Sequence, residues 1–342
     1  MNLERLVTRA WYEKQAWTKI LQPLSKIYSR EFEKRKKQSL ARRRAPFAVP
    51  VVVVGNITVG GTGKTPLIIY LANQLLSKNI KVGVVSRGYG AKPPSMPYLV
   101  KSGDSAVICG DEPRLIFEAT GAPVAIGEDR CAAAELLVEL GVSLILSDDG
   151  LQHYDMPREF EIAVIDGSRG LGNGRLLPAG PLREPVERLA SVDHVVSNGE
   201  LDPEYEGIPV DGHFRLAPAN WINVQTGTRV PLDFIPPGSE QYAVAGIGNP
   251  ERFFLELRGL GLEVVEKVFP DHHAFQKKDF AFLPSLETAT VFMTTKDALK
   301  CADFAGHNFW ALEVQLEFKK DAVGKDMGQS LVDSIMALRN FG

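Results

Sequence analysis

The sequence predicts an α/β protein with a mostly parallel sheet, followed by a second, smaller α/β unit. Three observations predict this class. From residue 50 onward, short runs rich in Val, Ile and Leu alternate with stretches of helical periodicity. The runs are nearly continuous rather than alternating, as expected of parallel strands that are covered on both faces. Glycine-rich turns separate the runs from the helical stretches, which is typical of α/β folds.

The expected elements follow one another along the chain. In the first part, apolar β-branched runs predict strands at 51–54, 82–85, 124–126, 142–146, 162–165 and 194–196, with helices at 66–77, 113–119 and 130–140. In the second part, strands are expected at 242–245, 263–268, 290–294 and 310–314, with helices at 251–257, 277–282 and 329–339. From about Gly212 the sequence predicts short strands in which apolar and polar residues alternate, and Pro236-Pro237-Gly238 forms a break. We therefore expect a basic amphipathic arm at 1–45, a larger domain at 46–212, and a smaller α/β domain with its linker at 213–342.

The composition is that of a folded protein with sizeable cores. Of the 342 residues, 44% are hydrophobic and 24% are charged, which excludes collagen, a coiled coil and wholesale disorder. The longest apolar stretch, at 45–54, is far shorter than the ~20 residues that span a bilayer, so no transmembrane helix is expected. Cys109, Cys131 and Cys301 are widely separated, which favours a reducing compartment over disulfides or a paired metal site. No secretion signal is expected at the N-terminus.

The first 45 residues form a strongly basic arm. They hold 13 Lys and Arg against four Asp and Glu, a net charge of +9 in a chain whose total is −3. Apolar residues recur between the basic ones at helical intervals, a pattern that fits a helix resting on an anionic membrane surface. The alternative is a helix docked on its own domain with a solvated basic face. No nucleic-acid partner is expected, because no nucleic-acid-binding motif accompanies the basic clusters.

The segment VVVVGNITVGGTGKTP at 51–66 has the order of a phosphate-binding loop: a buried strand, a glycine-rich turn, Lys, Thr and a helix. The eight loop residues are Thr58, Val59, Gly60, Gly61, Thr62, Gly63, Lys64 and Thr65. Their N–H groups would surround a phosphate chain, Lys64 would reach the β- and γ-phosphates, and Thr65 would offer its hydroxyl to Mg²⁺. Thr58 replaces the first glycine of the usual pattern. The loop predicts a P-loop NTPase domain.

Two acidic residues, Asp148 and Asp149, follow the apolar run at 142–147. A P-loop needs a carboxylate at the end of a neighbouring strand to hold or orient the metal ion, and this pair is expected to supply it. A turn or a helix cap is the alternative role. ATP is favoured over GTP, because the nearest match to a guanine-reading element, Thr295-Lys296-Asp297, has its acid one residue too early. The expected cofactors are therefore ATP and Mg²⁺.

Transfer of a phosphoryl group to an alcohol requires a group that accepts the hydroxyl proton. Asp111, in Gly-Asp-Glu-Pro, precedes an expected helix, and His272, in Phe-Pro-Asp-His-His, follows an expected strand. A histidine beside a carboxylate can be tuned to work near neutral pH if the two parts of the chain close on each other. Taken alone, each residue is also explained as a cap or a surface residue.

Together these motifs resemble the tetraacyldisaccharide 4'-kinase family, the lipid A 4'-kinases of Gram-negative bacteria. The resemblance covers nearly the whole chain. Its carriers are GNITVGGTGKTP at 55–66, SRGYG at 86–90, GDEP at 110–113, SDDGLQH at 147–153, LLPAGPLREP at 176–185, GIGNPERFF at 246–254, FPDHHAF at 269–275 and TTKDALK at 294–300. The family's loop also has Thr at the position of Thr58. The chain departs from the family at Thr295, where Glu is usual, which leaves the roles of Lys296 and Asp297 open.

The resemblance implies transfer of the ATP γ-phosphate to the 4'-hydroxyl of a tetraacylated glucosamine disaccharide 1-phosphate, giving lipid IVA. It implies a peripheral position at the cytoplasmic face of the inner membrane, where the lipid acceptor keeps its acyl chains. The implied architecture is a larger P-loop domain and a smaller α/β domain that are joined by a short β linker, with the site between them.

The resemblance also implies roles for individual residues. Asp111 would be the base toward the 4'-hydroxyl, with His272 orienting it or sharing its proton, and Lys64 would act on the transferred phosphate. The residues implied to lie near the metal are Thr65, Asp148, Asp149 and Glu184. Arg130 and Arg183 would clamp a donor or acceptor phosphate. Surface ion pairing is the alternative role for Arg130, Arg183 and Glu184.

Two other functions fit part of the same pattern. A membrane-associated P-loop ATPase would use hydrolysis as a conformational switch and would need no acceptor alcohol. Such a switch would not need the distant pair of Asp111 and His272. A nucleotide-sensing adaptor would bind ATP and a partner without turnover.

Overall fold

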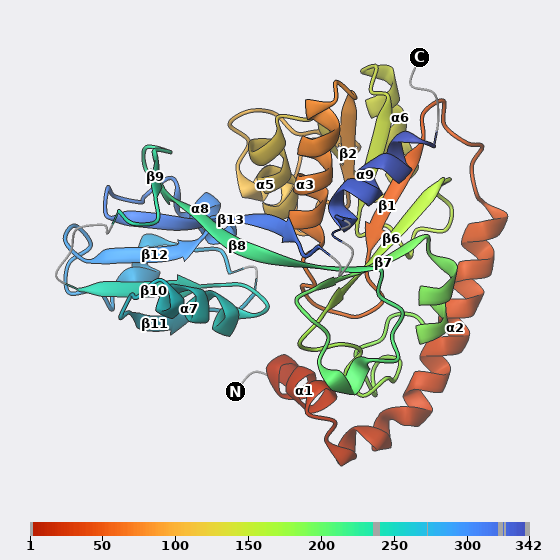
Figure 1. Cartoon of the computed structure of the whole chain (residues 1–342), viewed down its shortest axis with the longest axis horizontal. Helices are drawn as coiled ribbons and strands as arrows, with labels where there is room; N and C mark the ends of the chain where they lie inside the picture. Colours follow the sequence, from red (N-terminus) through yellow and green to blue (C-terminus); the bar gives the residue numbers. More distant parts are fainter. Residues whose placement is uncertain (1–2, 235–239, 272, 321–323, 325, 339–342) are drawn as a thin grey trace.

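The structure, a computed structural model, describes residues 3–234, 240–271, 273–320, 324 and 326–338, which form two lobes joined by one long sheet (Figure 1). The expected α/β class with a mostly parallel sheet is confirmed. The strands of the larger lobe are β1 (Val51–Gly55), β2 (Val82–Ser86), β3 (Tyr98–Leu99), β4 (Val124–Ile126), β5 (Leu144–Asp148), β6 (Phe160–Asp166) and β7 (His194–Asn198). Its helical segments are α3 (Lys64–Ser77), α4 (Ala106–Cys109), α5 (Asp111–Thr120), α6 (Arg130–Glu139), η2 (Val186–Ser191) and η3 (Pro203–Tyr205).

Strand β1 lies inside the sheet of the larger lobe. The strand order there is β7-β6-β1-β5-β2-β4-β3, and the pairs are parallel except for β3 with β4. Val52 of β1 is paired with Leu146 on one side and with Phe160 on the other. Since parallel strands end at the same edge of a sheet, the residues that follow β1, β5 and β7 are brought together there.

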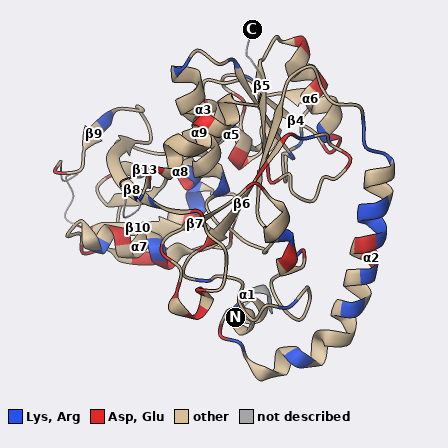
Figure 2. Cartoon of the chain, turned by 45° about the vertical axis from the view of Figure 1, so that its right-hand side comes forward, with Lys and Arg blue, Asp and Glu red and all other residues tan. Residues whose placement is uncertain are grey.

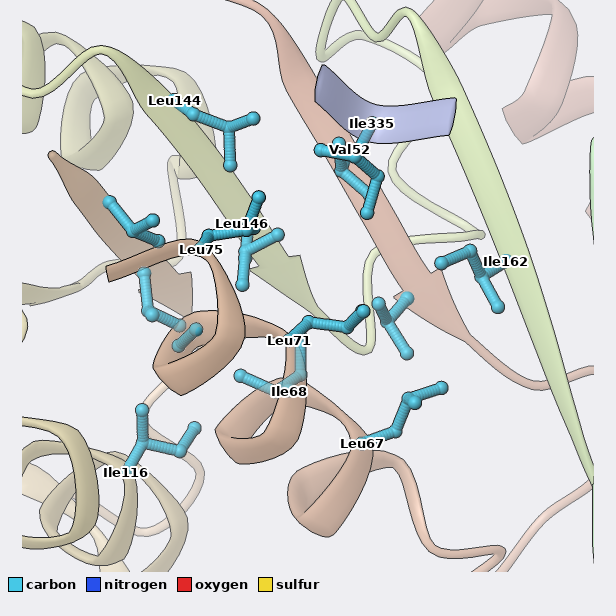
Figure 3. Close-up of a cluster of buried hydrophobic side chains, with 14 of the residues drawn as sticks. Val52, Leu67, Ile68, Leu71, Leu75, Ile116, Leu144, Leu146, Ile162 and Ile335 are labelled. Carbon is cyan, nitrogen blue, oxygen red and sulfur yellow. The ribbon is translucent and has the colours of Figure 1, made fainter. Parts of the chain in front are cut away.

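Alternate residues of β1 enter two cores. Val52 and Val54 belong to the core that includes α3 and α5, and Val51 and Val53 belong to the core on the opposite face, beneath α6. Figure 3 shows side chains of α3 packed against β1 and β5 in the first core. Burial on both faces explains why the strand sequence is apolar at every position.

The smaller lobe continues the same sheet with four parallel strands. They are β11 (Val265–Val268), β10 (Gln241–Ala245), β12 (Thr290–Thr294) and β13 (Phe309–Phe318), in that spatial order, and the helical segments are α7 (Pro250–Gly259), η4 (Lys277–Phe280) and α8 (Thr295–Cys301). The helix expected at 277–282 is a 3₁₀ turn over 277–280, and α8 was not expected from the sequence.

An antiparallel pair of long strands joins the lobes. Strand β8 (Gly212–Asn223) pairs in parallel with β7 and in antiparallel orientation with β13, from Phe214 opposite Phe318 to Asn223 opposite Trp310. The short strand β9 (Arg229–Pro231) pairs with β8. The sequence suggested only short strands here, because β8 and β13 are partly exposed and alternate between apolar and polar residues.

The C-terminal helix α9 (Met327–Met336) returns to the larger lobe. Its residues Leu331, Val332 and Ile335 are buried in the same core as β1 and α3. The range 213–342 that the sequence analysis expects for the smaller domain includes α9, whose buried residues pack in the core of the larger lobe. The expected boundary at 212 coincides with the start of β8, and the division there stays a proposal.

The N-terminal arm is helical and docks on the larger lobe. It consists of α1 (Leu3–Tyr12), the 3₁₀ segment η1 (Ala16–Leu21) and α2 (Gln22–Ala41), which runs along one side of the molecule (Figure 1). Trp11 Nε1 donates to the Pro178 carbonyl at 3.0 Å, and the Tyr28 hydroxyl donates to the Arg183 carbonyl at 2.9 Å. Figure 2 shows Lys and Arg distributed along α2. Within the described residues, no helix is both long and apolar enough to cross a membrane.

Candidate active site

The phosphate-binding loop connects β1 to α3, as the sequence predicts. Gly60 and Gly63 have φ of 101° and 99°, in the left-handed region that favours glycine. Thr58 instead forms an antiparallel bridge with Leu182, and the next N–H, of Val59, donates to the Pro181 carbonyl at 2.9 Å. A residue with a Cβ atom is therefore tolerated at position 58, because the chain is paired like a strand there.

Lys64 is the first residue of α3 and is held beside the ends of two strands. Its Nζ atom lies 3.2 Å from Oδ1 of Asn56, just after β1, and 3.5 Å from Oδ1 of Asp149, just after β5. The lysine side chain is 13% exposed. Thr65 follows it in the first turn of the helix and is half-buried. The loop thus presents a cation and a hydroxyl at a helix N-terminus, where an anion is also favoured by the helix dipole.

The two aspartates after the β5 run differ in their electrostatics. Asp148 is buried at the end of β5, and burial, together with the negative charge of Glu112, raises its pKa to about 7. Asp149 has a φ of 50°, and both of its oxygens accept hydrogen bonds from Arg183, at 2.9 and 3.1 Å. Although burial opposes ionisation of Asp149, Lys64 and Arg183 hold its pKa well below its usual range.

Asp148 has a polar atom suited to a metal ion or its water. Ser86 Oγ donates to Oδ2 of Asp148 at 3.3 Å, whereas Oδ1 is buried and accepts no hydrogen bond from any described residue. Among the described side chains, no three His, Cys, Asp or Glu residues gather in a metal-binding group. This arrangement fits Mg²⁺, which is usually held by one or two side chains together with substrate phosphates and water.

The two arginines of the predicted site have different surroundings. Arg130, the first residue of α6, is buried, and burial lowers its pKa to about 10. Its guanidinium donates to the backbone carbonyl oxygens of Asp148 and Asp149. Arg183 binds Asp149 through both terminal nitrogens and donates to the Thr58 carbonyl from Nε at 3.1 Å. The contacts of Arg130 position the two aspartates, and those of Arg183 connect an aspartate to the start of the loop.

Glu184, the residue after Arg183, is fully buried. Gln152 Nε2 donates to its Oε1 at 2.6 Å, the Tyr154 hydroxyl donates to its Oε2, and Arg188 Nε lies 3.5 Å from Oε2. These contacts support the 176–185 segment, and a role of Glu184 at the metal stays a prediction.

Two lysines of α8 connect the start of α5 with other residues of the smaller lobe, including Asp271 just before His272. Asp111 is the first residue of α5, and Lys300 Nζ of α8 lies 3.1 Å from its Oδ2. Lys296 Nζ lies 3.6 Å from Glu112 and 3.8 Å from Asp271, so the chain at 271 is close to the start of α5. His272 itself lies outside the described residues.

Several residues that contact the loop were missed by the sequence analysis. Asn56 contacts both Lys64 and Arg183, and Asn198, at the end of β7, donates to the Thr62 carbonyl at 3.2 Å. Arg252 of α7 donates to Asn198 Oδ1 at 2.9 Å. The only sequence signal for Asn198 is a polar residue at the end of an apolar run, in the same position as Asp148 on β5.

A glycine-rich loop at the carboxyl edge of a parallel sheet, with its lysine 3.5 Å from an aspartate that follows the neighbouring strand β5, defines a P-loop nucleotide-binding enzyme. Residues 17–331 match the family described as tetraacyldisaccharide-1-P 4'-kinase, whose members are ATP-dependent kinases, and the chain belongs to that family.

Curated relatives and one solved structure cover nearly the whole chain. The chain is 47% identical over 317 residues to the tetraacyldisaccharide 4'-kinase of Pseudomonas fluorescens, covering 92% of each chain. It is 48% identical over 322 residues to the one of Pseudomonas syringae pv. syringae, covering 93% of each. The crystal structure of LpxK from Aquifex aeolicus in complex with ATP is 28% identical, with a TM-score of 0.75, and the match covers 94% of this chain and 99% of that one.

Proposed function

We propose that this chain transfers the γ-phosphate of ATP to the 4'-hydroxyl of a tetraacylated glucosamine disaccharide 1-phosphate, giving lipid IVA. The observation that carries the proposal is the position of Lys64 at the start of α3, where its Nζ atom lies 3.2 Å from Asn56 Oδ1 and 3.5 Å from Asp149 Oδ1. The family membership supports both the nucleotide and the lipid acceptor.

The residues of the loop would bind and orient the triphosphate. N–H groups from Gly60 to Lys64 would donate to the phosphate oxygens, and the Lys64 ammonium would stabilise the negative charge that spreads over the γ-phosphate in the transition state. Asp111 would accept the proton of the 4'-hydroxyl while the oxygen of that hydroxyl forms a bond to the γ-phosphorus. The bond from that phosphorus to the β–γ bridging oxygen breaks, and ADP leaves. His272 is proposed to orient Asp111 or to share this proton.

Thr65 and Asp148 are the residues that we propose to hold Mg²⁺. The Oδ1 atom of Asp148, which has no hydrogen-bond partner among the described residues, supports this assignment. Asp149 would not hold the ion directly and would instead orient Lys64 through their contact. When bound, the ion would neutralise charge on the β- and γ-phosphates. Arg130 would keep both aspartates in place, and Arg183 would keep Asp149 in line with the loop.

The arm is proposed to rest on an anionic membrane surface, at the cytoplasmic face of the inner membrane, where the lipid acceptor is anchored. Three apolar residues at helical spacing, Ile20, Leu24 and Ile27, are 78%, 50% and 62% exposed. The exposed basic residues Lys19, Lys26 and Arg30 lie between and beside them. Such a surface combines apolar insertion with attraction to anionic lipids. The arm also docks on its own lobe, so both expectations for it are compatible with its contacts.

The experiment is a lipid-kinase assay with labelled ATP and detergent-dispersed disaccharide 1-phosphate. Wild-type protein is expected to label the lipid, and Lys64→Ala is expected to lower kcat by about 100-fold or more, because a transition-state charge loses its partner. Lys78→Ala, at the exposed end of the same helix, is the matched control. Release of free phosphate without labelled lipid would support the ATPase switch instead. Activity of Lys64→Ala within about threefold of wild type would refute the assignment of the loop.

A further inference from the structure

The smaller lobe contributes a lysine to the surroundings of Asp111. Helices α8 and α5 come from different lobes and pack against each other at the junction (Figure 1). Lys300, in the last turn of α8, places its Nζ atom 3.1 Å from Oδ2 of Asp111. A second contact between the two helices is made by Arg114, which donates to the Leu299 carbonyl at 3.2 Å. The two contacts differ in kind, since only the first involves the side chain of Asp111.

The ammonium of Lys300 is buried between two carboxylates. Its side chain is 5% exposed, and Nζ also lies 3.4 Å from Oδ1 of Asp297, whose side chain is fully buried. The side chain of Asp111 is 14% exposed. A buried ammonium is costly unless paired charges and hydrogen bonds compensate its lost hydration. The structure places a carboxylate group on each side of this buried ammonium.

Asp297 is fixed by its own lobe. Thr294 Oγ1 donates to Oδ2 of Asp297 at 2.8 Å, and the Gly246 N–H donates to the same oxygen at 3.0 Å. These bonds leave Oδ1 facing Lys300. Lys300 is therefore also held from within its own lobe, through Asp297, in addition to its contact with Asp111. A group held in this way can orient another group without reorganising itself.

We infer that Lys300 is a positioning residue for Asp111: it holds one carboxylate oxygen and keeps the base ionised and oriented when the two lobes are together. Asp297 supports Lys300, which gives a role to part of the 294–300 motif that the sequence left open. The inference rests on the proposed function, in which Asp111 accepts the hydroxyl proton. It predicts that Asp111, the proposed base from the larger lobe, is correctly oriented only when α8 of the smaller lobe brings Lys300 beside it.

The test compares kcat and KM in the lipid-kinase assay for three variants. Lys300→Met is expected to lower kcat by about 10- to 100-fold and to leave KM for ATP within about threefold, because the ion pairs of Lys300 among the described residues are with Asp111 and Asp297, outside the phosphate-binding loop. Lys300→Arg keeps the charge. Its log kcat is expected to lie above that of Lys300→Met by at least a third of the difference between Lys300→Met and the wild type. If Lys300→Met does not fold, Lys300→Gln, which keeps a donor without the charge, replaces it. Equal kcat for wild type and the uncharged variant would overturn the inference.

Arg114→Ala separates positioning from simple attachment of the lobes. It removes the contact to the Leu299 carbonyl and is expected to lower kcat by less than about threefold; a loss as large as that of Lys300→Met would overturn the inference. In an Asp111→Asn background, Lys300→Met is expected to add no further loss, because residues that act as a unit are not additive. A full multiplicative loss would mean that Lys300 acts elsewhere. The proposed role of Asp111 itself would fail separately, if Asp111→Asn kept wild-type kcat.

Discussion

A Cβ atom on Gly63 would lie 2.7 Å from the side-chain nitrogen of Asn198, which itself donates to the carbonyl of Thr62. Asn198 is 5% exposed and ends β7, two strands away from β1 in the sheet. The last turn of the phosphate-binding loop is therefore packed against the end of β7. Glycine is required at position 63 both for its φ of 99° and for this close approach.

Gly63→Ala is expected to lower the free energy of unfolding by about 1–3 kcal/mol, because it adds backbone strain and a contact that must be relieved. Gly61→Ala is the matched control, since φ there is not in the left-handed region and a Cβ atom would meet no atom of the described chain within 4 Å. The measurement is denaturant unfolding without nucleotide. Equal stability of the two variants would contradict the packing described for Gly63.

His153 is expected to weaken the protein at acidic pH. Burial, and then the charge of Arg130, lowers its pKa from 6.5 to about 4. As the pH falls below 6.5, the unfolded chain binds a proton on this residue that the folded chain does not bind until about pH 4, so stability is lost in that window. At pH 5 the loss is about 2 kcal/mol.

His153→Gln should remove this part of the acid sensitivity. The difference in unfolding free energy between pH 7 and pH 5 is expected to be smaller in the variant than in the wild type by about 2 kcal/mol. Chemical denaturation at both values measures it, with the comparison at pH 8 as the baseline for any loss of packing. Parallel pH profiles for the two proteins would show that His153 is not the group responsible.

The exposed apolar residues of the arm should determine binding to membranes. Replacing Ile20 and Ile27 together by Glu is expected to reduce co-sedimentation with anionic vesicles by about tenfold or more, because apolar insertion is lost and the charge becomes less favourable. Leu255→Glu, at a residue of α7 that is 57% exposed on the smaller lobe, is the control. Wild-type binding by the arm variant would leave the arm with its docking role alone.

Much of the fold could be predicted from local sequence. The runs that form β1, β2, β4 and β12 were located within one residue of their observed ends, because strands buried on both faces are apolar throughout. The long strands β8 and β13 and the return of α9 could not be predicted in this way. Their partners lie far away in the sequence, and the residue pattern of a partly exposed strand does not indicate which strand will pair with it.

The candidate site divides along the same line. Thr58 to Thr65 could be located because the loop's chemistry lies in one contiguous segment, and the structure gives the reason that Thr58 is accepted there. Asn198 and Lys300 could not be assigned, because their importance depends on which residues the sheet and the lobes bring beside them. The pairing of Asp111 with His272 stays a prediction.

By itself, the sequence determined the strand, loop and helix of the candidate phosphate site, the basic arm, and the apolar runs that form the parallel strands. Each of these features depends on residues that are close together in the chain and on local backbone freedom. Only the tertiary structure decided that one sheet runs through both lobes, that the arm docks on the larger lobe, and that a lysine of α8 reaches Asp111. The physical reason is that burial and charge pairing act through space, between residues that are distant along the chain, such as Asp111 and Lys300, which are 189 positions apart.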